Sequence, residues 1–417
     1  MLPSIVSLLE DNGKMTFTLN NTNVSIANGL RRIVSEVPVV AFKTSPYEEG
    51  LCDIEINTTR QNNEIIKQRL SCIPIYANAT FPVENYVLTI DKQNTGNSIL
   101  YVTSEDFNII DLTSGKTDKD LARKLFPPND ITFKLFGTND YPELARLLPC
   151  ITDNSKGNRL KLTCKFSIVS AKQHGMFNIT STCAYANTPD IDRQREAWNE
   201  KKKIFTGSKE ELAFMYRDWE LLDGKRIFIE NSYDFIIETV GPISPPDIIS
   251  GAATLMIDKL TKFQQVLQIR DGNDIISESV SSMANSYDIL LISEDYTLGK
   301  VLEYSIYNNN YGKELNFCGF KKPHPHIENS IIRIVFINNV NRTEIISLLV
   351  KAAADAILVY DTIRNVFSRK DNNYTETAAI RTAQATRTSQ ATRTSQATRT
   401  SQATITAQST LMTPKNN

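Results

Sequence analysis

The stretch "LNNTNVSIANGLRRIVSEVPVVAF", from Leu19 to Phe42, decides the fold of the first part of the chain. Its apolar residues recur at helical spacing and form one stripe. The residues of this stripe are Ile26, Leu30, Ile33, Val34 and Val37. Thr22 or Asn23 can cap the start of the helix, and Pro38 ends it. The pattern therefore predicts an amphipathic helix between two strands.

The polar face of this helix carries two adjacent arginines. On a helical wheel Arg32 lies opposite the stripe together with Asn28 and Ser35, while Arg31 lies on its flank. Most such faces are simply solvated. A contact with a partner is the alternative, and it gains weight because a similar unit recurs near the other end of the chain.

Length and composition indicate a folded protein of two or three domains: 417 residues, 41% hydrophobic and 22% charged. A net charge of −1 argues against broad wrapping of nucleic acid. We expect no membrane span and no signal peptide. The six cysteines form no CxxC pair, so we expect no zinc site and a reducing compartment. They are Cys52, Cys72, Cys150, Cys164, Cys183 and Cys318.

A hairpin opens the chain, and a β-rich region follows the first helix. Asp11-Asn12-Gly13 lies between two alternating runs and predicts a tight turn. From about residue 46 to 186, short β-like runs alternate with turn clusters, and one helix near Asn63–Ser71 interrupts them. The runs are "LCDIEINTT", "NYVLTI", "SILYVT", "DITFKLF" and "RLKLTCKFSIV". We therefore expect an inserted, mainly β domain at 49–189.

A charged helical segment at 190–223 leads back to the first unit. The strand "YDFIIETVG" comes next, and Pro245 and Pro246 then open a helix that runs to about Ile269. Residues 271–286 have the composition of a linker. The stripe of this helix includes Leu260 and Phe263.

After the linker the opening pattern recurs in compact form. The strand "YDILLIS" precedes a helix that Thr297 can cap, and the loop "FCGFKKPHPHIEN" precedes the strand "SIIRIVFI". A long helix from about Thr343 to Phe367 ends the unit. The apolar stripes of these two helices include Leu298, Leu302, Leu349, Ala353 and Ile357.

The tail is of low complexity, with three copies of "RTSQAT". It contains too little apolar surface to offset the entropy of ordering, so we expect disorder over 371–417. Plain solvation is the simpler expectation for its arginines, and weak contact with nucleic acid is the alternative.

The sequence offers little catalytic chemistry. It has no phosphate-binding glycine loop, no dinucleotide fingerprint and no HExxH. His324 and His326 lie close in sequence to Cys318, but no further ligand completes a metal site. Asp190 and Asp192 fit a solvated loop better than a Mg²⁺ site. Binding is therefore the better hypothesis, with a metal-dependent enzyme as the remote one.

Several motifs resemble those of the alpha-type assembly subunits of cellular RNA polymerases: bacterial alpha, the archaeal D subunit and the eukaryotic third-largest subunit. The motifs are "LNNTNVSIANGLRRIVSEVPVVAF", "NTTRQNNEIIKQRLSCIPI", "AKQHGMFNITSTCAYANTPD" and "FIIETVGPISPPDIISGAATLM". From Tyr287 onward, "EDYTLGKVLE" and "FCGFKKPHPHIENSIIRIVF" resemble the small partner of that family, the archaeal L and eukaryotic eleventh-subunit type.

The resemblance implies a fusion of two partners that form a heterodimer in the family, as in large cytoplasmic DNA viruses. The implied fold is α+β, with two related strand-and-helix dimerisation modules docked within one chain. An inserted mainly β domain splits the first module, and a disordered tail follows the second. The implied parts are 1–48 with 224–270 (first module), 49–189 (insert), 190–223 (helical extension), 271–286 (linker), 287–370 (second module) and 371–417 (tail).

The resemblance also implies which residues meet other proteins. The implied subunit-interface residues are Asn28, Arg31, Arg32, Arg69, Lys172, His174, Lys322 and His324. An arginine fork can hold carboxylates or backbone carbonyls at a partly dry interface. The implied core between the modules consists of the apolar stripes named above. Many relatives carry a cysteine-rich metal cluster in the insert, but the cysteine spacing here does not support one.

The implied function is that of a non-catalytic assembly subunit of a DNA-directed RNA polymerase. Its partners would be the two largest subunits, especially the second-largest, and small polymerase subunits. The catalytic Mg²⁺ would belong to the large subunits, no cofactor is expected here, and DNA would be met only through the holoenzyme. No homodimer and no membrane contact are expected. The implied location is a viral factory in the host cytoplasm or the virion, with the nucleus as the alternative. A free-standing nucleic-acid-binding scaffold that uses the tail is the competing hypothesis.

Overall fold

The computed structural model describes residues 2–44, 51–129, 138–150, 157–269 and 275–368. The strand expected at 130–136 and the disorder expected at 371–417 lie outside these residues.

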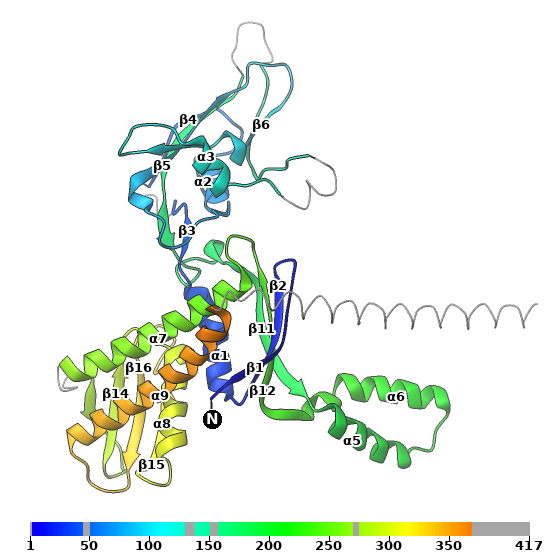
Figure 1. Ribbon diagram of the computed structural model, residues 1–417, viewed down its shortest axis with the longest axis vertical. Coiled ribbons are helices and arrows are strands. Elements are labelled where there is room, and N and C mark those ends of the chain that lie inside the picture. The colour runs from blue at the N-terminus through cyan, green and yellow to red at the C-terminus, as the bar shows by residue number, and fades with distance from the viewer. Residues whose placement is uncertain (1, 45–50, 130–137, 151–156, 270–274, 369–417) are drawn as a thin grey trace, which may run out of the picture. The chain divides into compact units, whose positions relative to one another are not determined.

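The first module is a four-stranded antiparallel sheet with two helices (Figure 1). Its strand order is β1-β2-β12-β11. The elements are β1 (Ser4–Asp11), β2 (Lys14–Asn20), α1 (Val24–Ile33), β11 (Thr180–Pro189), β12 (Phe228–Thr239) and α7 (Pro245–Ile269). The expected hairpin turn is confirmed, because Asn12 and Gly13 have φ values of 47° and 78°, as a two-residue turn of type I′ requires.

Helix α1 begins and ends close to the predicted residues. Of the two candidate caps, Asn23 is the one used: its side chain accepts a hydrogen bond of 2.9 Å from the Ser25 backbone N–H. The helix tightens into a 3-10 turn, η1 (Val34–Glu36), before Pro38. The strand β3 (Val39–Ala41) follows. The local signals of capping and proline therefore set both ends of the helix.

The second module has the same parts (Figure 1). Its four-stranded antiparallel sheet has the order β13-β14-β16-β15. The elements are β13 (Ile276–Glu278), β14 (Ser286–Leu291), α8 (Tyr296–Asn310), β15 (Leu315–Lys321), β16 (Ser330–Phe336) and α9 (Arg342–Ser368).

The two modules are related element by element. Each runs strand, strand, helix, strand, strand, helix along the chain, and each sheet places its third and fourth strands in reversed order. Equivalent helices contact each other: α1 packs against α8, and α7 against α9. Contact between equivalent parts is the mark of a two-fold, isologous interface, here formed inside one chain.

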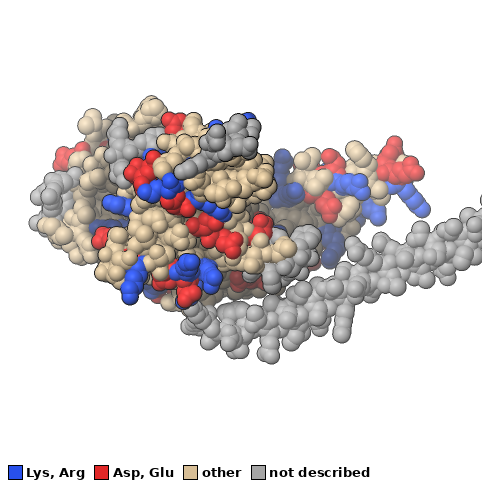
Figure 2. Space-filling model, turned by 90° about the horizontal axis from the view of Figure 1, so that it is seen from above, with Lys and Arg blue, Asp and Glu red and all other residues tan. Residues whose placement is uncertain are grey.

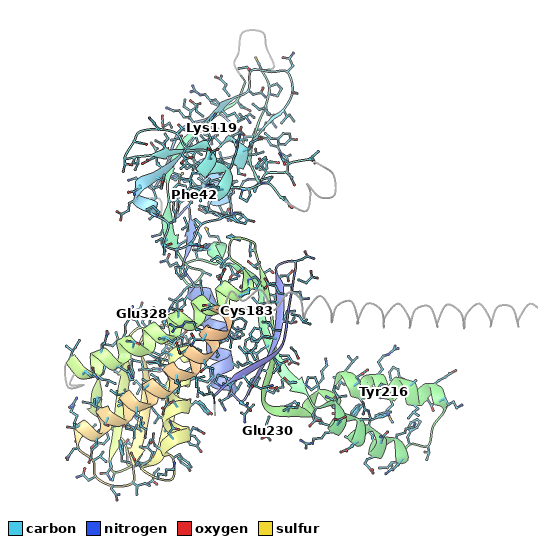
Figure 3. All side chains as sticks on the ribbon, viewed as in Figure 1. Phe42, Lys119, Cys183, Tyr216, Glu230 and Glu328 are labelled. Atoms are coloured by element: carbon cyan, nitrogen blue, oxygen red, sulfur yellow. The ribbon has the colours of Figure 1, made fainter. Side chains whose placement is uncertain are left out.

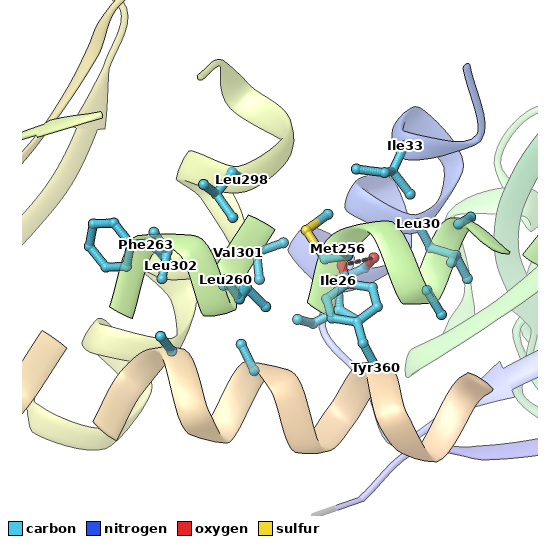
Figure 4. Close-up of a cluster of buried hydrophobic side chains, with 14 of the residues drawn as sticks. Ile26, Leu30, Ile33, Met256, Leu260, Phe263, Leu298, Val301, Leu302 and Tyr360 are labelled. Atoms are coloured by element: carbon cyan, nitrogen blue, oxygen red, sulfur yellow. Dashed lines mark hydrogen bonds between the residues drawn. The ribbon is translucent and has the colours of Figure 1, made fainter. Parts of the chain in front are cut away.

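One hydrophobic core joins the modules (Figure 4). All of the predicted core residues are buried in it except Ile357, which is partly buried because Ala356 and Tyr360 occupy the inner face of α9. The sheet of the first module also reaches the second, since the ring of Phe17 meets that of Phe367 edge-on at 5.1 Å. The two modules therefore share one interior rather than forming separate globules.

The insert has a second core of its own. Its four-stranded sheet has the order β4-β9-β5-β7, and β6 pairs with β8. The elements are β4 (Cys52–Asn57), α2 (Asn63–Ser71), β5 (Tyr86–Gln93), β6 (Leu100–Thr103), β7 (Asn108–Asp111), α3 (Lys119–Leu125), β8 (Glu143–Leu147) and β9 (Arg159–Lys165). Phe42 belongs to this core (Figure 3), and β10 (Ser167–Val169) pairs with β3 of the first module. Helix α2 has the predicted bounds, whereas α3, β7 and β8 were not predicted.

The charged segment forms two helices, as expected: α5 (Ile191–Lys203) and α6 (Lys209–Leu221). The rings of Trp198, Tyr216 and Trp219 hold them together, with centroids 4.9 Å apart for Trp198–Tyr216 and 5.4 Å apart for Trp198–Trp219. Tyr216 of α6 is labelled in Figure 3. Ser208 and Glu211 form a capping box at the start of α6.

Two expected boundaries are wrong. The sequence places strand β11 in the insert, but it pairs with β12 in the sheet of the first module. The composition of residues 271–286 predicts a linker, but β13 lies within them and pairs with β14. The buried pair Ile275 and Ile276 supplies its apolar contact, and so short an apolar run gives no detectable periodicity.

Two further local expectations differ from the structure. The expected loop from Phe317 begins inside strand β15, which runs to Lys321. This is an edge strand whose side chains, apart from Leu315, are exposed or half-buried, so its hydrophobic alternation is weak. The cap of α8 is Asp295 rather than Thr297, because the Asp295 carboxylate accepts a bond of 2.8 Å from the Thr297 backbone N–H.

Candidate subunit interface

The outer flank of α1 presents Asn28 and Arg31 together. The Asn28 amide oxygen accepts bonds from the Arg31 Nε at 3.1 Å and from its second guanidinium nitrogen at 3.0 Å. Both side chains are half-buried. The Cys183 thiol of β11 lies against the Arg31 carbonyl at 3.9 Å (Figure 3). Within the described residues Arg31 is thus held in place by an amide, and its charge is not neutralised by a carboxylate.

Arg32 bridges the two modules. Its terminal nitrogen pairs with the Asp295 carboxylate at 2.8 Å, and its Nε donates to the Thr297 hydroxyl at 3.0 Å. The expectation that Arg32 points away from the fold is therefore wrong. A helical wheel places a side chain relative to its own helix, but the docked second module also covers this flank of α1. About a third of each charged side chain stays exposed.

The surroundings of the Asp295 carboxyl favour its ionised form. Burial disfavours its charge, but the hydrogen bonds from the Thr297 backbone and hydroxyl, together with the Arg32 guanidinium, outweigh burial and lower the pKa of the carboxyl. The carboxylate thus serves two purposes at once: it caps α8 and it binds α1. One substitution at this position disturbs both.

A second charged bridge lies beside the first. The Lys259 ammonium of α7 contacts Glu36 of η1 at 3.0 Å and Glu294, just before α8, at 2.9 Å. All three side chains are at most 20% exposed. Burial disfavours the lysine charge, but Glu294 and then Glu36 outweigh it and raise the pKa of Lys259. Glu36 also accepts Lys172 at 3.0 Å, so an ion network extends from the surface into the junction.

The two modules also approach each other closely at Gly29. The buried Tyr360 hydroxyl of α9 donates to the Ile26 carbonyl of α1 at 3.1 Å (Figure 4). A Cβ on Gly29 would lie 2.6 Å from that hydroxyl and 2.9 Å from a methyl group of Val301 on α8. Only glycine therefore lets α1 reach both helices of the second module.

The structure brings together three of the predicted interface residues. Arg31, Arg32 and Lys172 line one surface hollow, which Asp295 and Thr297 of the second module complete. Asn28 adjoins it through Arg31. This hollow at the module junction, lined by cations that α1 and its neighbouring loop position, is the candidate site for a partner protein.

The other predicted residues lie elsewhere. Arg69 belongs to the insert, where it ties α2 to β8 by donating to the Glu143 carbonyl at 2.7 Å. His174 is exposed, and its Nδ1 caps a 3-10 turn by accepting from the Met176 N–H at 3.2 Å. Lys322 and His324 lie in the turn between β15 and β16. Lys322 donates to the Glu328 carbonyl at 3.2 Å, and the His324 Nδ1 accepts from the His326 N–H at 3.1 Å.

Over the described residues, no three histidine, cysteine, aspartate or glutamate side chains come together as metal ligands would. None of the helices described is both long and apolar enough to span a bilayer. The geometry of the junction is that of a contact between the two modules, built from ion pairs, the Asn28–Arg31 hydrogen bonds and a shared core.

Sequence reasoning missed three residues that join the modules: Gly29, Lys259 and Asp295. It includes Tyr360 in the apolar stripe of the last helix but does not predict the bond of its hydroxyl to α1. One signal was available, since a glycine inside a strong helical stripe costs helix stability and suggests close approach of another element. Nothing in the sequence pairs Lys259 with two distant glutamates, because those contacts depend on how the modules dock.

Family profiles agree with this duplicated architecture. A profile described as "RNA polymerase Rpb3/Rpb11 dimerisation domain" matches residues 16–260, and a second with the same description matches residues 286–366. The two matches fall on the two modules, with the insert inside the first.

Curated relatives point the same way. "DNA-directed RNA polymerases IV and V subunit 3B" of Arabidopsis thaliana is 30% identical over 283 residues, 58% of this chain and 85% of the relative. "DNA-directed RNA polymerase subunit Rpo3" of Pyrococcus furiosus is 26% identical over 271 residues, 60% of this chain and 92% of the relative. "DNA-directed RNA polymerases I and III subunit RPAC2" of Saccharomyces cerevisiae is 28% identical over 101 residues, 24% of this chain and 67% of the relative. The chain belongs to the family of the RNA polymerase Rpb3/Rpb11 dimerisation domain and carries two such domains in one polypeptide.

Proposed function

We propose that this chain is the assembly platform of a multisubunit DNA-directed RNA polymerase, equivalent to a two-protein heterodimer but folded as one molecule. It would bind the two largest subunits, the second-largest above all, together with small subunits, and would leave nucleotidyl transfer and Mg²⁺ to the large ones. It would meet DNA only within the holoenzyme.

The observation that carries this proposal is the single core shared by both modules. Helices that would expose apolar stripes if either module folded alone are buried against their equivalents in the other. A second copy of the chain is then not needed to cover them, which favours a monomeric platform over a homodimer.

The junction hollow is the part of the platform that we assign to a large subunit. Arg31 is half-buried and already held in position by Asn28, so binding costs little side-chain entropy. Its guanidinium can hold a carboxylate or a backbone carbonyl with two parallel hydrogen bonds. Figure 2 shows acidic and basic side chains interspersed on the face drawn, which supports protein contact rather than wrapping of a phosphate backbone.

The test is recovery of the two largest subunits, from the same source, on a tagged full-length chain. Arg31→Glu should weaken this recovery about tenfold, equivalent to about 1.4 kcal/mol. Lys119→Glu is the matched control, because Lys119 is an exposed lysine of the insert, on α3 (Figure 3). Equal recovery by both variants, with unchanged melting curves, would overturn the assignment of the hollow.

Arg32→Ala separates two roles of its side chain. We expect weaker recovery of the large subunits, as for Arg31, but also a small loss of stability from the bond to Asp295. Half-exposed ion pairs contribute about 0.2–1 kcal/mol. A thermal melt measures the loss of stability, and the recovery assay measures the loss of binding, so the two effects can be told apart.

The competing scaffold hypothesis is tested by removing residues 371–417. We expect the shortened chain to recover the large subunits as well as the full chain does, whereas a tail-dependent nucleic-acid scaffold would lose its function. For location we propose the viral factory or virion, and immunolabelling of infected cells that placed the chain only in the nucleus would contradict this.

A further inference from the structure

Cys52 and Cys164 lie directly opposite each other on neighbouring strands of the insert. They are paired in the register of antiparallel β4 and β9. At the adjacent pair, the Lys165 N–H donates to the Leu51 carbonyl at 2.8 Å. Hydrogen-bonded and non-hydrogen-bonded pairs alternate along such a ladder, so the two cysteines occupy a non-hydrogen-bonded pair.

That position suits a bond between the two sulfur atoms. In non-hydrogen-bonded pairs the Cα atoms lie about 4.5 Å apart and the side chains are close. A disulfide needs a Cα separation of about 4.4–6.8 Å. Strand geometry therefore provides the spacing without movement of the backbone.

Both cysteines are also buried. Cys52 is 5% exposed and Cys164 is not exposed at all. Cys164 faces Leu88 of β5 on its other side, and both cysteines belong to the apolar core of the insert. The Cys164 thiol donates to the adjoining Lys165 carbonyl, 3.6 Å from its sulfur. Each thiol therefore has the other as its reactive neighbour.

The two sulfur atoms are electrostatically unequal. The neighbouring Cys164 side chain lowers the pKa of Cys52 against the opposing effect of burial, and the nearby Lys67 charge lowers it further. The Cys52 side chain, together with burial, raises the pKa of Cys164 well above its ordinary value. Of the two thiols, Cys52 is therefore the one that gives up its proton more readily. A reactive thiol with a resolving thiol beside it has this division of roles.

We propose that Cys52 and Cys164 form an oxidisable dithiol that closes to a disulfide across β4 and β9 when the protein meets a peroxide. Cys52 loses its proton, its thiolate attacks one peroxide oxygen, the O–O bond breaks, and the released hydroxide takes up a proton and leaves as water. The resulting sulfenic acid is attacked by the Cys164 sulfur. The S–S bond forms, and the second oxygen leaves as water with the Cys164 proton. One peroxide is reduced to two waters, and two thiols are oxidised.

Closure would fasten the start of the insert to its end. Strand β4 is the first strand of this sheet in the chain and β9 the last, so the bond encloses the segment between Cys52 and Cys164. A cross-link stabilises the enclosed segment chiefly by restricting its unfolded state. The oxidised insert should therefore resist unfolding and proteolysis more than the reduced one.

The experiment treats the full chain with hydrogen peroxide, blocks remaining thiols under denaturing conditions and maps peptides by mass spectrometry. We expect one linked peptide pair containing Cys52 and Cys164, two fewer free thiols, and full reversal by dithiothreitol. Cys72 is exposed and serves as an internal positive control, since its oxidation shows that the peroxide has reacted with the protein.

Matched variants decide between the outcomes. Cys72→Ser should still form the link, whereas Cys164→Ala should lose it and carry over-oxidised Cys52 instead, because no resolving thiol remains. Circular dichroism of each reduced variant checks that it is folded. Oxidation of Cys72 without a link between Cys52 and Cys164 in the wild-type chain would overturn the proposal.

Discussion

Adding one methyl group at Gly29 is the sharpest test of how the two modules meet. In Gly29→Ala the new Cβ would lie 2.6 Å from the Tyr360 hydroxyl and 2.9 Å from a Val301 methyl group. Real Cβ atoms essentially never approach that closely. Both neighbours are fully buried and belong to the second module, so neither can turn aside without disturbing the junction.

The expected change in the free energy of unfolding is the sum of two destabilising effects and one stabilising effect. Overpacking of a well-packed core costs about 1–3 kcal/mol. Displacing the Tyr360 hydroxyl from the Ile26 carbonyl adds about 1 kcal/mol or more, because a buried donor is left unsatisfied. The higher helix propensity of alanine returns about 0.5–1 kcal/mol. We therefore expect a net destabilisation of about 1–3 kcal/mol.

The assay is urea unfolding of the full chain, followed by far-ultraviolet circular dichroism. Gly251→Ala is the matched control, since Gly251 lies in helix α7 and its added Cβ would meet only a Val37 methyl group at an ordinary 3.6 Å. That variant should gain about 0.5–1 kcal/mol from helix propensity alone. The two glycine substitutions are thus expected to have opposite signs.

The result that refutes the reasoning is a gain of stability in both variants. If the modules did not dock in solution, Gly29 would be an ordinary helical glycine, and alanine would strengthen α1 just as it strengthens α7. A destabilised Gly29→Ala beside a stabilised Gly251→Ala can be explained only by contact across the junction.

Three further changes test the junction by other means. Leu30→Asp places a charge in the shared core and should cost several kcal/mol, so a wild-type melting temperature would contradict its burial. Lys259→Met removes the cation between Glu36 and Glu294 and should cost about 3 kcal/mol at neutral pH, measured by urea unfolding, because two carboxylates then face each other without compensation. Asp295→Asn tests pH: the lowered pKa of this carboxyl means that its contribution is present above the unfolded value near 4 and is lost as pH falls through the folded value. The wild type should therefore lose more stability than the variant between about pH 5 and pH 3, and identical acid profiles would exclude the Asp295 bond.

The elements that sequence could predict are those governed by neighbouring residues. The stripe through Ile26 and Leu30, the Asn23 cap and the turn at Gly13 all depend on signals within a few positions, and all are present in the structure. Helix α7 starts at Pro245 and ends at Ile269, as its proline start and stripe indicated.

What escaped prediction depends on contacts between distant segments. Strand β11 reads as part of the insert because its neighbours in sequence are there, yet its partner β12 is reached only after α5 and α6. Arg32 looks solvent-facing on its own helix, yet Asp295 lies 263 positions away and covers it. The first of these contacts forms inside one module and the second between docked modules, and local propensity specifies neither.

Because both modules belong to one polypeptide, their stoichiometry is fixed and their association does not depend on protein concentration. A pair of separate proteins comes apart as it is diluted, and any imbalance in their synthesis leaves one partner with bare apolar helices. Here every copy that is made brings both halves in equal number. The midpoint of its unfolding should consequently be the same at nanomolar and micromolar protein.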